Sequence, residues 1–378
     1  MINVLVTGGA GFIGSNFVRH ALQTHADWKV TTLDKLTYAG RRENLHDVMD
    51  HDRHVFVHGD ILDAAVSGPL VEQSHLVVHF AAETHVDRSI MAAGEFIRTD
   101  VEGTFTLLEA ARRAPHLRRF VQISTDEVYG SVPTGSSRET DELRPRNPYA
   151  ASKAGADRLA YSYWATHGVP IIITRASNNY GPYQFPEKVI PLFVTNAIDD
   201  RPLPLYGDGR NVRDWLHVLD HCRALDVVID RGVDGEVYNV GGGNDVMNVD
   251  LTRRILQVLG KPLSLITPVA DRQGHDRRPT VELRRDRRLE GAAHPGDARR
   301  QGHVPHVGVH VVQPGHVRGP GPDRRHERHA VPDLDEAVPP AVPPHHLAER
   351  GPREHHVAAG LADDPVPVAP GHLRAADR

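Results

Sequence analysis

Apolar residues come in short runs along the first 175 positions, and each run is followed by a longer segment with helical spacing of apolar residues. Short apolar runs are typical of strands buried on both faces, and the amphipathic segments are typical of helices that cover a sheet. The predicted strands are an N-terminal run that ends before Gly8, Lys29–Leu33, His54–Val57, Leu76–Phe80, Arg119–Ser124 and Val169–Thr174. The predicted helices run from after Gly11 to about Thr24, from Glu95 to Ala114 and from Tyr149 to Thr166. This alternation predicts an α/β fold with a doubly wound parallel sheet.

The pattern fails in the last hundred residues, 279–378. After Tyr238 there is no aromatic residue, and Asn, Lys and Ile each disappear before residue 270. Arg, His, Pro, Gly, Ala and Val remain, and such a composition cannot build a packed core. Either the tail is a disordered, low-complexity segment, or it is the translation of a GC-rich gene in a shifted frame from about Arg278. The loss of residues with AT-rich codons favours the frame shift, so we interpret its histidine pairs, such as His345-His346, as accidental and predict no metal site.

A glycine pattern follows the first strand. Gly8, Gly11 and Gly14 form Gly-x-x-Gly-x-x-Gly at a tight turn into a helix, where a backbone without side chains lets a pyrophosphate reach the helix amides. Asp34 ends the second strand, twenty residues beyond Gly14, where a carboxylate binds ribose hydroxyls and repels a 2′-phosphate. The pattern therefore predicts a Rossmann-type site that prefers NAD to NADP. Asp60-Ile61 after the third strand would lie at the adenine, and Ala81 to Thr84 after the fourth at the nicotinamide ribose.

A second group of residues carries proton chemistry. Tyr149 and Lys153 lie one helical turn apart, so the ammonium could stabilise a tyrosinate and lower the pKa of the phenol from about 10. Asp126 and Glu127 follow the fifth strand, and adjacent carboxylates raise one pKa so that one of them can stay protonated. Alone, the first pair would be a surface pair on a helix and the second a solvated turn. Together with the glycine turn they indicate an enzyme that moves a hydride and several protons.

These segments carry a family resemblance that extends from Met1 to about Arg278. The chain resembles the extended short-chain dehydrogenases/reductases and, among them, the dTDP-glucose 4,6-dehydratase family. The segments that carry the resemblance are Thr7–Ser15, Leu33–Gly40, His79–Ser89, Asp126-Glu127, Ser177–Pro182, Phe185–Lys188, Leu205–Gly209 and Asp271–Asp276. The later segments are far more specific than the glycine turn, which many unrelated oxidoreductases share.

The resemblance implies NAD as the cofactor and dTDP-glucose as the substrate, with thymine or uracil not separated by the sequence. It implies that Tyr149 and Lys153 take the proton of the sugar 4-hydroxyl, that Glu127 takes the C5 proton, that Asp126 protonates the leaving C6 hydroxyl, and that Thr125 steadies the O4 region. Matching positions toward NAD are Gly8, Gly11, Phe12, Ile13, Gly14, Asp34, Lys35, Leu36, Thr37, Asp60, Ile61, Ala81, Ala82, Glu83, Thr99, Tyr149, Lys153 and Asn179. Matching positions toward the sugar nucleotide are Thr84, Thr125, Asn178, Glu187, Lys188, Pro204, Tyr206, Arg213, Asn248, Arg272 and His275. Asp100 and Leu219 depart from the family pattern, and neither is expected to touch the chemistry.

The resemblance also implies a domain plan. Residues 1–180 form the NAD-binding domain, and residues 181–278 a smaller sugar-nucleotide-binding lobe built from Pro182–Pro204 and Asn248–Asp276. The two interleave, because the chain returns to the sheet near 210–241, for example at Glu236–Gly241. The predicted helices 95–114 and 149–166 would form a four-helix interface in a homodimer.

Charge and composition exclude other classes. A formal net charge of −5 gives no basic face for nucleic acid, and no apolar run is long enough to span a bilayer. The single cysteine, Cys222, cannot form an intramolecular disulfide and is expected to be a small buried residue, which suits the cytoplasm. Other functions stay open: a 4-epimerase, which needs no acid and base pair; a decarboxylase, which needs an arginine at the substrate carboxylate; another nucleotide-sugar dehydratase; or an inactive NAD-binding protein.

Overall fold

The fold is known from a computed structural model, which describes residues 1–132, 134–271, 274–278, 281–283 and 309–310. The predicted frame shift and the tail from residue 284 onward, apart from residues 309–310, lie outside the described residues, as do Arg272 and Gln273.

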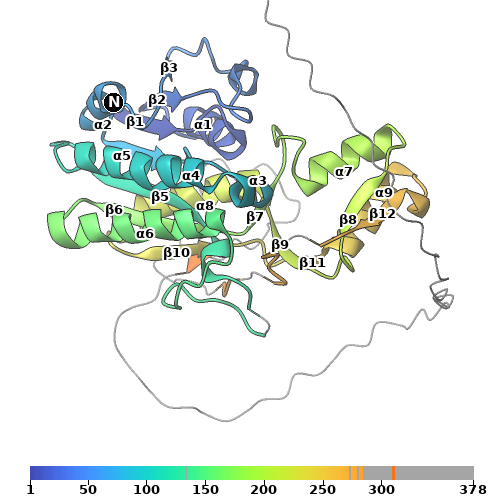
Figure 1. Cartoon of the computed structure of the whole chain (residues 1–378). Coiled ribbons are helices and arrows are strands. Elements are labelled where there is room, and N and C mark those ends of the chain that lie inside the picture. Colours follow the sequence, from blue (N-terminus) through green and yellow to red (C-terminus); the bar gives the residue numbers. More distant parts are fainter. Residues whose placement is uncertain (133, 272–273, 279–280, 284–308, 311–378) are drawn as a thin grey trace, which may run out of the picture. The chain divides into compact units, whose positions relative to one another are not determined.

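An eight-stranded sheet forms the centre of the larger lobe, with the strand order β13-β10-β6-β5-β4-β1-β2-β3 (Figure 1). All pairs are parallel except β10 with β13, which is antiparallel. The strands are β1 (Ile2–Thr7), β2 (Trp28–Asp34), β3 (His54–His58), β4 (Leu76–His79), β5 (Arg119–Thr125), β6 (Ile171–Ala176), β10 (Val237–Val240) and β13 (Val309–His310). The order reverses between β4 and β1, and a crevice at the carboxyl ends of the strands is where such folds bind ligands. The predicted doubly wound parallel sheet is therefore confirmed.

Helices cover both faces of this sheet. On one face α2 packs against α5, and α5 against α6; on the other α1 packs against α8 (Figure 1). These helices are α1 (Phe12–Thr24), α2 (Ala64–Glu72), α5 (Gly103–Ala111), α6 (Pro148–His167) and α8 (Val218–Arg231). Three short elements accompany α5 and α6 on their face: α3 (Val86–Met91), α4 (Ala93–Phe96) and η2 (Ile97–Glu102).

The helix predicted for residues 95–114 is wrong in detail. The segment is divided into α4, η2 and α5, and η2 has π-helical hydrogen bonds. A π-helical turn adds one residue to the turn and changes which side chains share a face, and such turns are frequent at functional sites. Here the turn contains Asp100, which is buried. Hydrophobic periodicity does not reveal such a turn, because the apolar positions on either side keep helical spacing.

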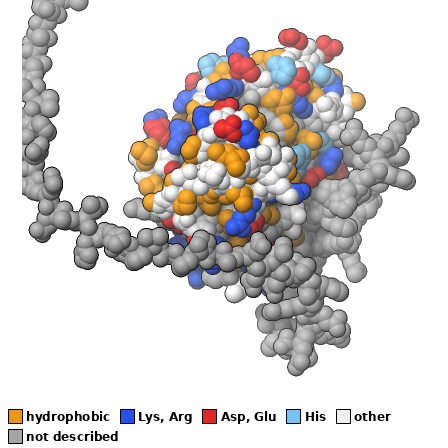
Figure 2. Space-filling model, turned by 90° about the vertical axis from the view of Figure 1, so that its right-hand side faces the viewer, with side chains coloured by type: hydrophobic (Ala, Val, Ile, Leu, Met, Phe, Trp, Pro, Cys, Tyr) orange, Lys and Arg blue, Asp and Glu red, His pale blue; other side chains and the backbone are white. Residues whose placement is uncertain are grey.

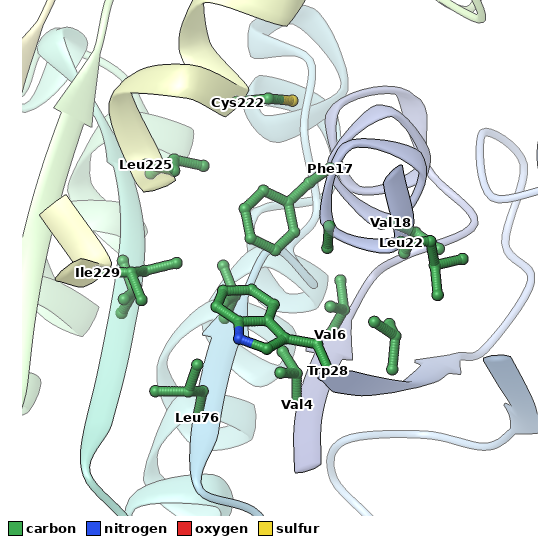
Figure 3. Packing of buried hydrophobic residues seen from close by; sticks show 14 of the residues in the cluster. Val4, Val6, Phe17, Val18, Leu22, Trp28, Leu76, Cys222, Leu225 and Ile229 are labelled. Carbon is green, nitrogen blue, oxygen red and sulfur yellow. The ribbon is translucent and has the colours of Figure 1, made fainter. Parts of the chain in front are cut away.

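The core between the sheet, α1 and α8 is apolar. Phe17 of α1 lies beside Trp28 of β2, and Cys222 and Leu225 of α8 close the cluster from the other side (Figure 3). Cys222 is a free, fully buried thiol, as predicted. Burying such side chains contributes roughly 1.5–3 kcal/mol each. This core fixes α1, and with it the glycine turn, against the sheet.

A second group of elements contains α7 (Val189–Ile198), β8 (Leu203–Tyr206), α9 (Asn248–Leu259), η4 (Leu263–Leu265) and β12 (Ile266–Val269). β12 pairs in parallel with β8, and α7 and α9 bury a small core around Phe193, Leu203 and Leu256. β7 (Asn178–Tyr180), β9 (Val212–His217) and β11 (Asp245–Met247) form a three-stranded sheet between this group and the larger sheet (Figure 1). The face that carries α7 and α9 shows hydrophobic side chains dispersed among charged ones (Figure 2). The division predicted from the sequence, in which residues 181–278 form a smaller lobe interleaved with returns to the larger sheet, stays a prediction.

Candidate active site

The candidate active site is a cavity of about 730 Å³. Its walls are the carboxyl ends of β1, β2, β4, β5 and β6 on one side and β7, α7 and β8 on the other. Parallel strands bring residues distant in sequence to one edge of the sheet, so the glycine turn and the proton-handling residues share this cavity. Every predicted site residue in the described part of the chain lines it except Leu36.

The glycine turn packs closely against the backbone that follows β4. Gly8 has a φ of +69°, and a Cβ at this position would lie 2.6 Å from the amide nitrogen of Ala81. A Cβ at Gly14 would lie 2.3 Å from the carbonyl oxygen of Gly8. Only glycine fits at either position. Gly11 caps α1 without a side-chain hydrogen bond, so the first amides of the helix are positioned to take an anion.

Asp34 ends β2 and is buried beside this turn. Its Oδ2 accepts from the Ala10 amide at 2.9 Å and its Oδ1 from the Leu36 amide at 2.8 Å. Burial raises its pKa, and the two amide hydrogen bonds oppose that rise. Each carboxylate oxygen accepts more than one hydrogen bond, so Asp34 retains capacity for ribose hydroxyls. Leu36 serves this arrangement through its amide, while its side chain packs against the apolar core.

The acid and base pair lies in η3 (Asp126–Tyr129), the short 3₁₀ helix that follows β5. Thr125 caps this helix: its Oγ1 accepts from the Glu127 amide at 3.3 Å and donates to Asp126 Oδ1 at 3.2 Å. Burial and the neighbouring Glu127 raise the pKa of Asp126 to about 8, against the opposing charge of Arg213. Asp126 is therefore protonated at neutral pH. Its buried Oδ2 has no hydrogen-bond partner within the described chain, which leaves it free to donate a proton to a ligand.

Tyr149 and Lys153 lie in the first turns of α6. Asn147 caps this helix by accepting from the Ala150 amide at 2.8 Å, and Pro148 occupies its first position. The Lys153 ammonium donates to the Ile123 carbonyl at 2.7 Å. Burial, and then the charges of Glu127 and Asp100, raise the pKa of Tyr149, and a hydrogen bond with Thr125 opposes that rise, so the net lowering predicted from the sequence is not found.

The far side of the cavity carries the predicted sugar-nucleotide residues. Lys188 Nζ donates to Thr84 Oγ1 at 3.3 Å, and Glu187 Oε1 accepts from the Tyr38 hydroxyl at 2.8 Å. Other predicted residues that line this side are Asn178, Pro204, Tyr206, Arg213, Asn248 and His275. Two cations and a histidine in one wall suit a diphosphate. Arg272 lies outside the described residues.

Several site residues were not predicted. Tyr38 lines the cavity under the Arg88 guanidinium, 3.7 Å from its ring centre, and joins the loop after β2 to Glu187. His221 is fully buried, and its Nδ1 lies 3.0 Å from Asn179 Oδ1. Asp100 does not line the cavity, as expected, but its charge is among the causes that raise the pKa of Tyr149. Leu219 is exposed and does not line the cavity. Of these residues, Tyr38 alone lies within a segment that carries the family resemblance, Leu33–Gly40, so only Tyr38 could have been predicted from the sequence.

Buried polar atoms without protein partners indicate what the cavity binds. Ser124 Oγ, Ser177 Oγ, Gln184 Oε1, His221 Nε2 and Asn248 Oδ1 are buried in its lining and make no hydrogen bond to any described residue. An unpaired buried polar atom costs about 1–3 kcal/mol, so such a set points to a polar ligand with several hydrogen-bonding groups. A dinucleotide along the glycine turn and a sugar nucleotide along the opposite wall provide such groups.

Residues 5–301 match the sequence model of the GDP-mannose 4,6 dehydratase family. The chain belongs to this family of dehydratases. A dTDP-glucose 4,6-dehydratase of Streptomyces antibioticus is 54% identical over 282 residues, which are 73% of this chain and 83% of that protein. The low-salt glycan biosynthesis protein Agl12 of Haloferax volcanii is 52% identical over 288 residues, 76% of this chain and 92% of that protein.

Solved structures of this dehydratase family agree with the fold. DesIV, a dTDP-glucose 4,6-dehydratase of Streptomyces venezuelae solved with NAD and dTDP bound, is 52% identical with a TM-score of 0.73. The match covers 74% of this chain and 88% of DesIV. A UDP-glucuronic acid 4-epimerase of Bacillus cereus has a similar TM-score of 0.71 but is only 26% identical. That match covers 74% of this chain and 90% of the epimerase. The fold is thus shared with epimerases, while sequence identity favours the dehydratases.

None of the described helices is long and apolar enough to cross a membrane.

Proposed function

We propose that this dehydratase converts dTDP-glucose to dTDP-4-keto-6-deoxyglucose and water, with NAD as a cofactor that is regenerated in each turnover. The observation that carries the proposal is the position of Asp126 and Glu127 beside Tyr149 in one cavity, with Asp126 held protonated at neutral pH. The kinship to dTDP-glucose 4,6-dehydratases supports the choice of substrate.

The cofactor is NAD. The glycine turn and the uncapped start of α1 would hold its diphosphate, and Asp34 would hold the hydroxyls of its adenosine ribose. The carboxylates of Asp34 and Asp60 disfavour a 2′-phosphate at that end of the cavity. When bound, NAD supplies a positively charged hydride acceptor for C4 and later a hydride donor for C6.

The residues of the chain move the protons. Tyr149 takes the proton of the 4-hydroxyl while C4 is oxidised, and the Lys153 ammonium stabilises the tyrosinate. The resulting ketone acidifies the C5 hydrogen, which Glu127 removes as a base. Asp126 protonates the C6 hydroxyl, so that water leaves and a C5–C6 double bond forms. Glu127 and Asp126 are adjacent because base and acid serve neighbouring carbons, and Thr125 orients Asp126 through its hydroxyl.

The direct test incubates the purified protein with NAD and dTDP-glucose. We expect a 4-keto-6-deoxy product, identified by its absorbance in alkali and by NMR, with no net NADH. UDP-glucose serves as the comparison for base preference. A folded, NAD-binding protein that yields only a C4 epimer would make the chain an epimerase, and one that yields nothing would support an inactive NAD-binding protein.

A 4-epimerase activity explains fewer of the residues in this cavity than a dehydratase activity does. A 4-epimerase shares the cofactor site, Tyr149 and Lys153 but has no use for a protonated Asp126 next to Glu127. A decarboxylase needs an arginine at the substrate carboxylate, whereas Arg213 acts electrostatically on Asp126 and stands in the wall assigned to the sugar nucleotide.

We also propose that the enzyme is a cytoplasmic homodimer that pairs through η2, α5 and α6. Large apolar side chains on these helices are exposed, among them Ile97 at 51%, Phe105 at 46% and Tyr161 at 39%. Exposed apolar side chains on adjacent helices mark an interaction surface when they form a contiguous patch. The three helices lie side by side on one face of the sheet (Figure 1).

Phe105→Lys is therefore expected to yield a monomer in light-scattering chromatography, because a buried lysine would lose its hydration at the interface. Val258→Lys is the control, since Val258 is 71% exposed in α9, away from these helices. A Phe105→Lys variant with the mass of the wild-type dimer would place the interface elsewhere.

A further inference from the structure

Asp100 is a carboxylate enclosed by the active-site helices. It lies in the π-helical turn η2 and is 1% exposed. Its Oδ1 accepts from the Glu83 amide at 2.8 Å, and its Oδ2 accepts from Ser152 Oγ at 2.6 Å. It therefore joins the loop after β4 to α6, between Tyr149 and Lys153. A buried, charged carboxylate needs hydrogen-bond donors, and the Glu83 amide and the Ser152 hydroxyl supply one to each oxygen of Asp100.

The charge of Asp100 acts on the tyrosine. Among the causes that raise the pKa of Tyr149, the Asp100 carboxylate follows burial and Glu127. Burial raises the pKa of Asp100 itself to about 6, while the Lys153 ammonium and the Ser152 hydroxyl oppose that rise. Asp100 therefore takes up a proton as the pH falls through about 6.

The other titratable groups around Asp100 come from β4, from the loop after β4, from α6 and from η3. Glu83, in the loop after β4, raises the pKa of Asp100 weakly through its charge. His79 of β4 is buried and its pKa is lowered to about 3, so it is neutral. Tyr149 and Lys153 face it from α6, and Glu127 acts on Tyr149 from η3. Asp100 is thus a buried carboxylate that shares this site with the Lys153 ammonium and the Tyr149 phenol.

We propose that Asp100 is a positioning residue that tunes the proton affinity of Tyr149, and so the pH range over which oxidation at C4 proceeds. The inference rests on the proposed function, because it assigns a base role to Tyr149. Above about pH 6 the charged Asp100 makes Tyr149 harder to deprotonate. Below that pH, Asp100 takes up a proton and its repulsion disappears, which partly offsets the loss of tyrosinate. The acid limb of the oxidation rate is therefore flatter than that of a single titrating base.

The test replaces the charge and keeps the shape. Asp100→Asn retains an oxygen that can accept from one of the two donors but carries no charge. The control is Glu109→Gln: Glu109 of α5 also accepts a hydrogen bond from α6, from the Tyr163 hydroxyl at 2.5 Å, but is farther along both helices. Each protein is loaded with NAD, mixed with dTDP-glucose, and followed by NADH absorbance in a single turnover across pH 5 to 9.

Asp100→Asn is expected to shift the acid limb to lower pH by about one unit, since a nearby like charge displaces a pKa by one unit or more. The rate on that limb rises up to about tenfold, and the limb becomes as steep as for a single base. Glu109→Gln should follow the wild type. An Asp100→Asn profile that superimposes on the wild type would overturn the proposal.

A second readout does not need turnover. A fluorinated tyrosine, whose phenol titrates at lower pH, is placed at position 149 and its ¹⁹F resonance is followed in NAD-loaded protein without sugar nucleotide. The midpoint should fall in Asp100→Asn and stay unchanged in Glu109→Gln. If wild-type protein forms no NADH from dTDP-glucose, the proposed function fails, while this midpoint still decides the role of Asp100.

Ser152→Ala keeps the proposal testable if Asp100→Asn does not fold. The Ser152 hydroxyl lowers the pKa of Asp100, so its removal should raise that pKa and move the flattened part of the profile to higher pH. A profile that only loses amplitude, without this displacement, would show that Ser152 and Asp100 act on structure alone.

Discussion

Glu127→Gln is expected to leave oxidation at C4 intact while product formation falls by about 10²–10⁴-fold, because only the C5 proton loses its base. The substitution preserves size, and a glutamine oxygen can still accept from the Asn147 side chain, which lies 3.4 Å from Glu127 Oε2. NADH should then accumulate on the enzyme after dTDP-glucose is added, since the hydride has no C6 acceptor until water has left.

Rapid-quench sampling combined with NADH absorbance measures both steps. Tyr149→Phe is the matched variant, and it should suppress the NADH transient itself, because the 4-hydroxyl then keeps its proton. Glu142→Gln is the control for the change of charge, since Glu142 lies in an exposed loop and, within the described part of the chain, pairs only with Arg144. Equal loss of the NADH transient in the Glu127 and Tyr149 variants would show that the two residues do not divide the chemistry as proposed.

Much of the fold was predictable because its signals are local. A buried parallel strand is a short apolar run, and β1 to β6 of the sheet lie within two or three residues of the predicted bounds. Part of the glycine turn was predictable for the same reason, because a Cβ at Gly14 would meet the backbone of Gly8, six residues earlier, whereas the contact that requires glycine at position 8 is with the distant Ala81. The start of α6 also follows from adjacent residues, Asn147 and Pro148.

What the sequence did not reveal depends on distant partners. Tyr38 contacts Glu187 across 149 positions, and Asp100 contacts Ser152 across 52. No periodicity records such pairs. The same reason explains why the direction of the Tyr149 pKa was not predicted, since spacing alone could not show that burial, Glu127 and Asp100 raise it. The resemblance supplied residue roles for the cavity, but Asp100 had no role to take over, because this chain departs from the family there.

The largest effect on stability is expected at Arg175. Its guanidinium is 1% exposed; its Nε donates to Asp157 Oδ2 at 3.0 Å and an Nη donates to the Tyr129 hydroxyl at 2.7 Å. Asp157 is fully buried, and its Oδ1 has no hydrogen-bond partner among the described residues. Arg175→Met should therefore lower the free energy of unfolding by about 3–5 kcal/mol, because it leaves an uncompensated charge in the core.

The sign of a second substitution tests that reason. Asp157→Asn in the wild-type background should also destabilise, because it leaves the guanidinium without its counter-charge. In the Arg175→Met background the same substitution should stabilise, because it removes the stranded carboxylate. Urea unfolding at fixed pH measures all four proteins, and the exposed pair Arg144 and Glu142 serves as the control, where no such coupling is expected. Additive losses in the double variant would contradict the charge argument and leave packing as the cause.

This buried pair also bears on catalysis. Arg175 of β6 donates to Asp157 of α6 and to Tyr129 of η3, so it links these three elements. Tyr129 lies two residues beyond Glu127, and its hydroxyl donates to Asn239 Oδ1 at 2.9 Å. If the network only stabilises the fold, the four proteins will differ in unfolding free energy but give the same NADH transient under folding conditions. If it also holds η3 in place, Arg175→Met will slow product formation more than the NADH transient, because Asp126 and Glu127 act in the elimination. We expect the second outcome, since η3 is a single short turn whose far end is fixed by Tyr129.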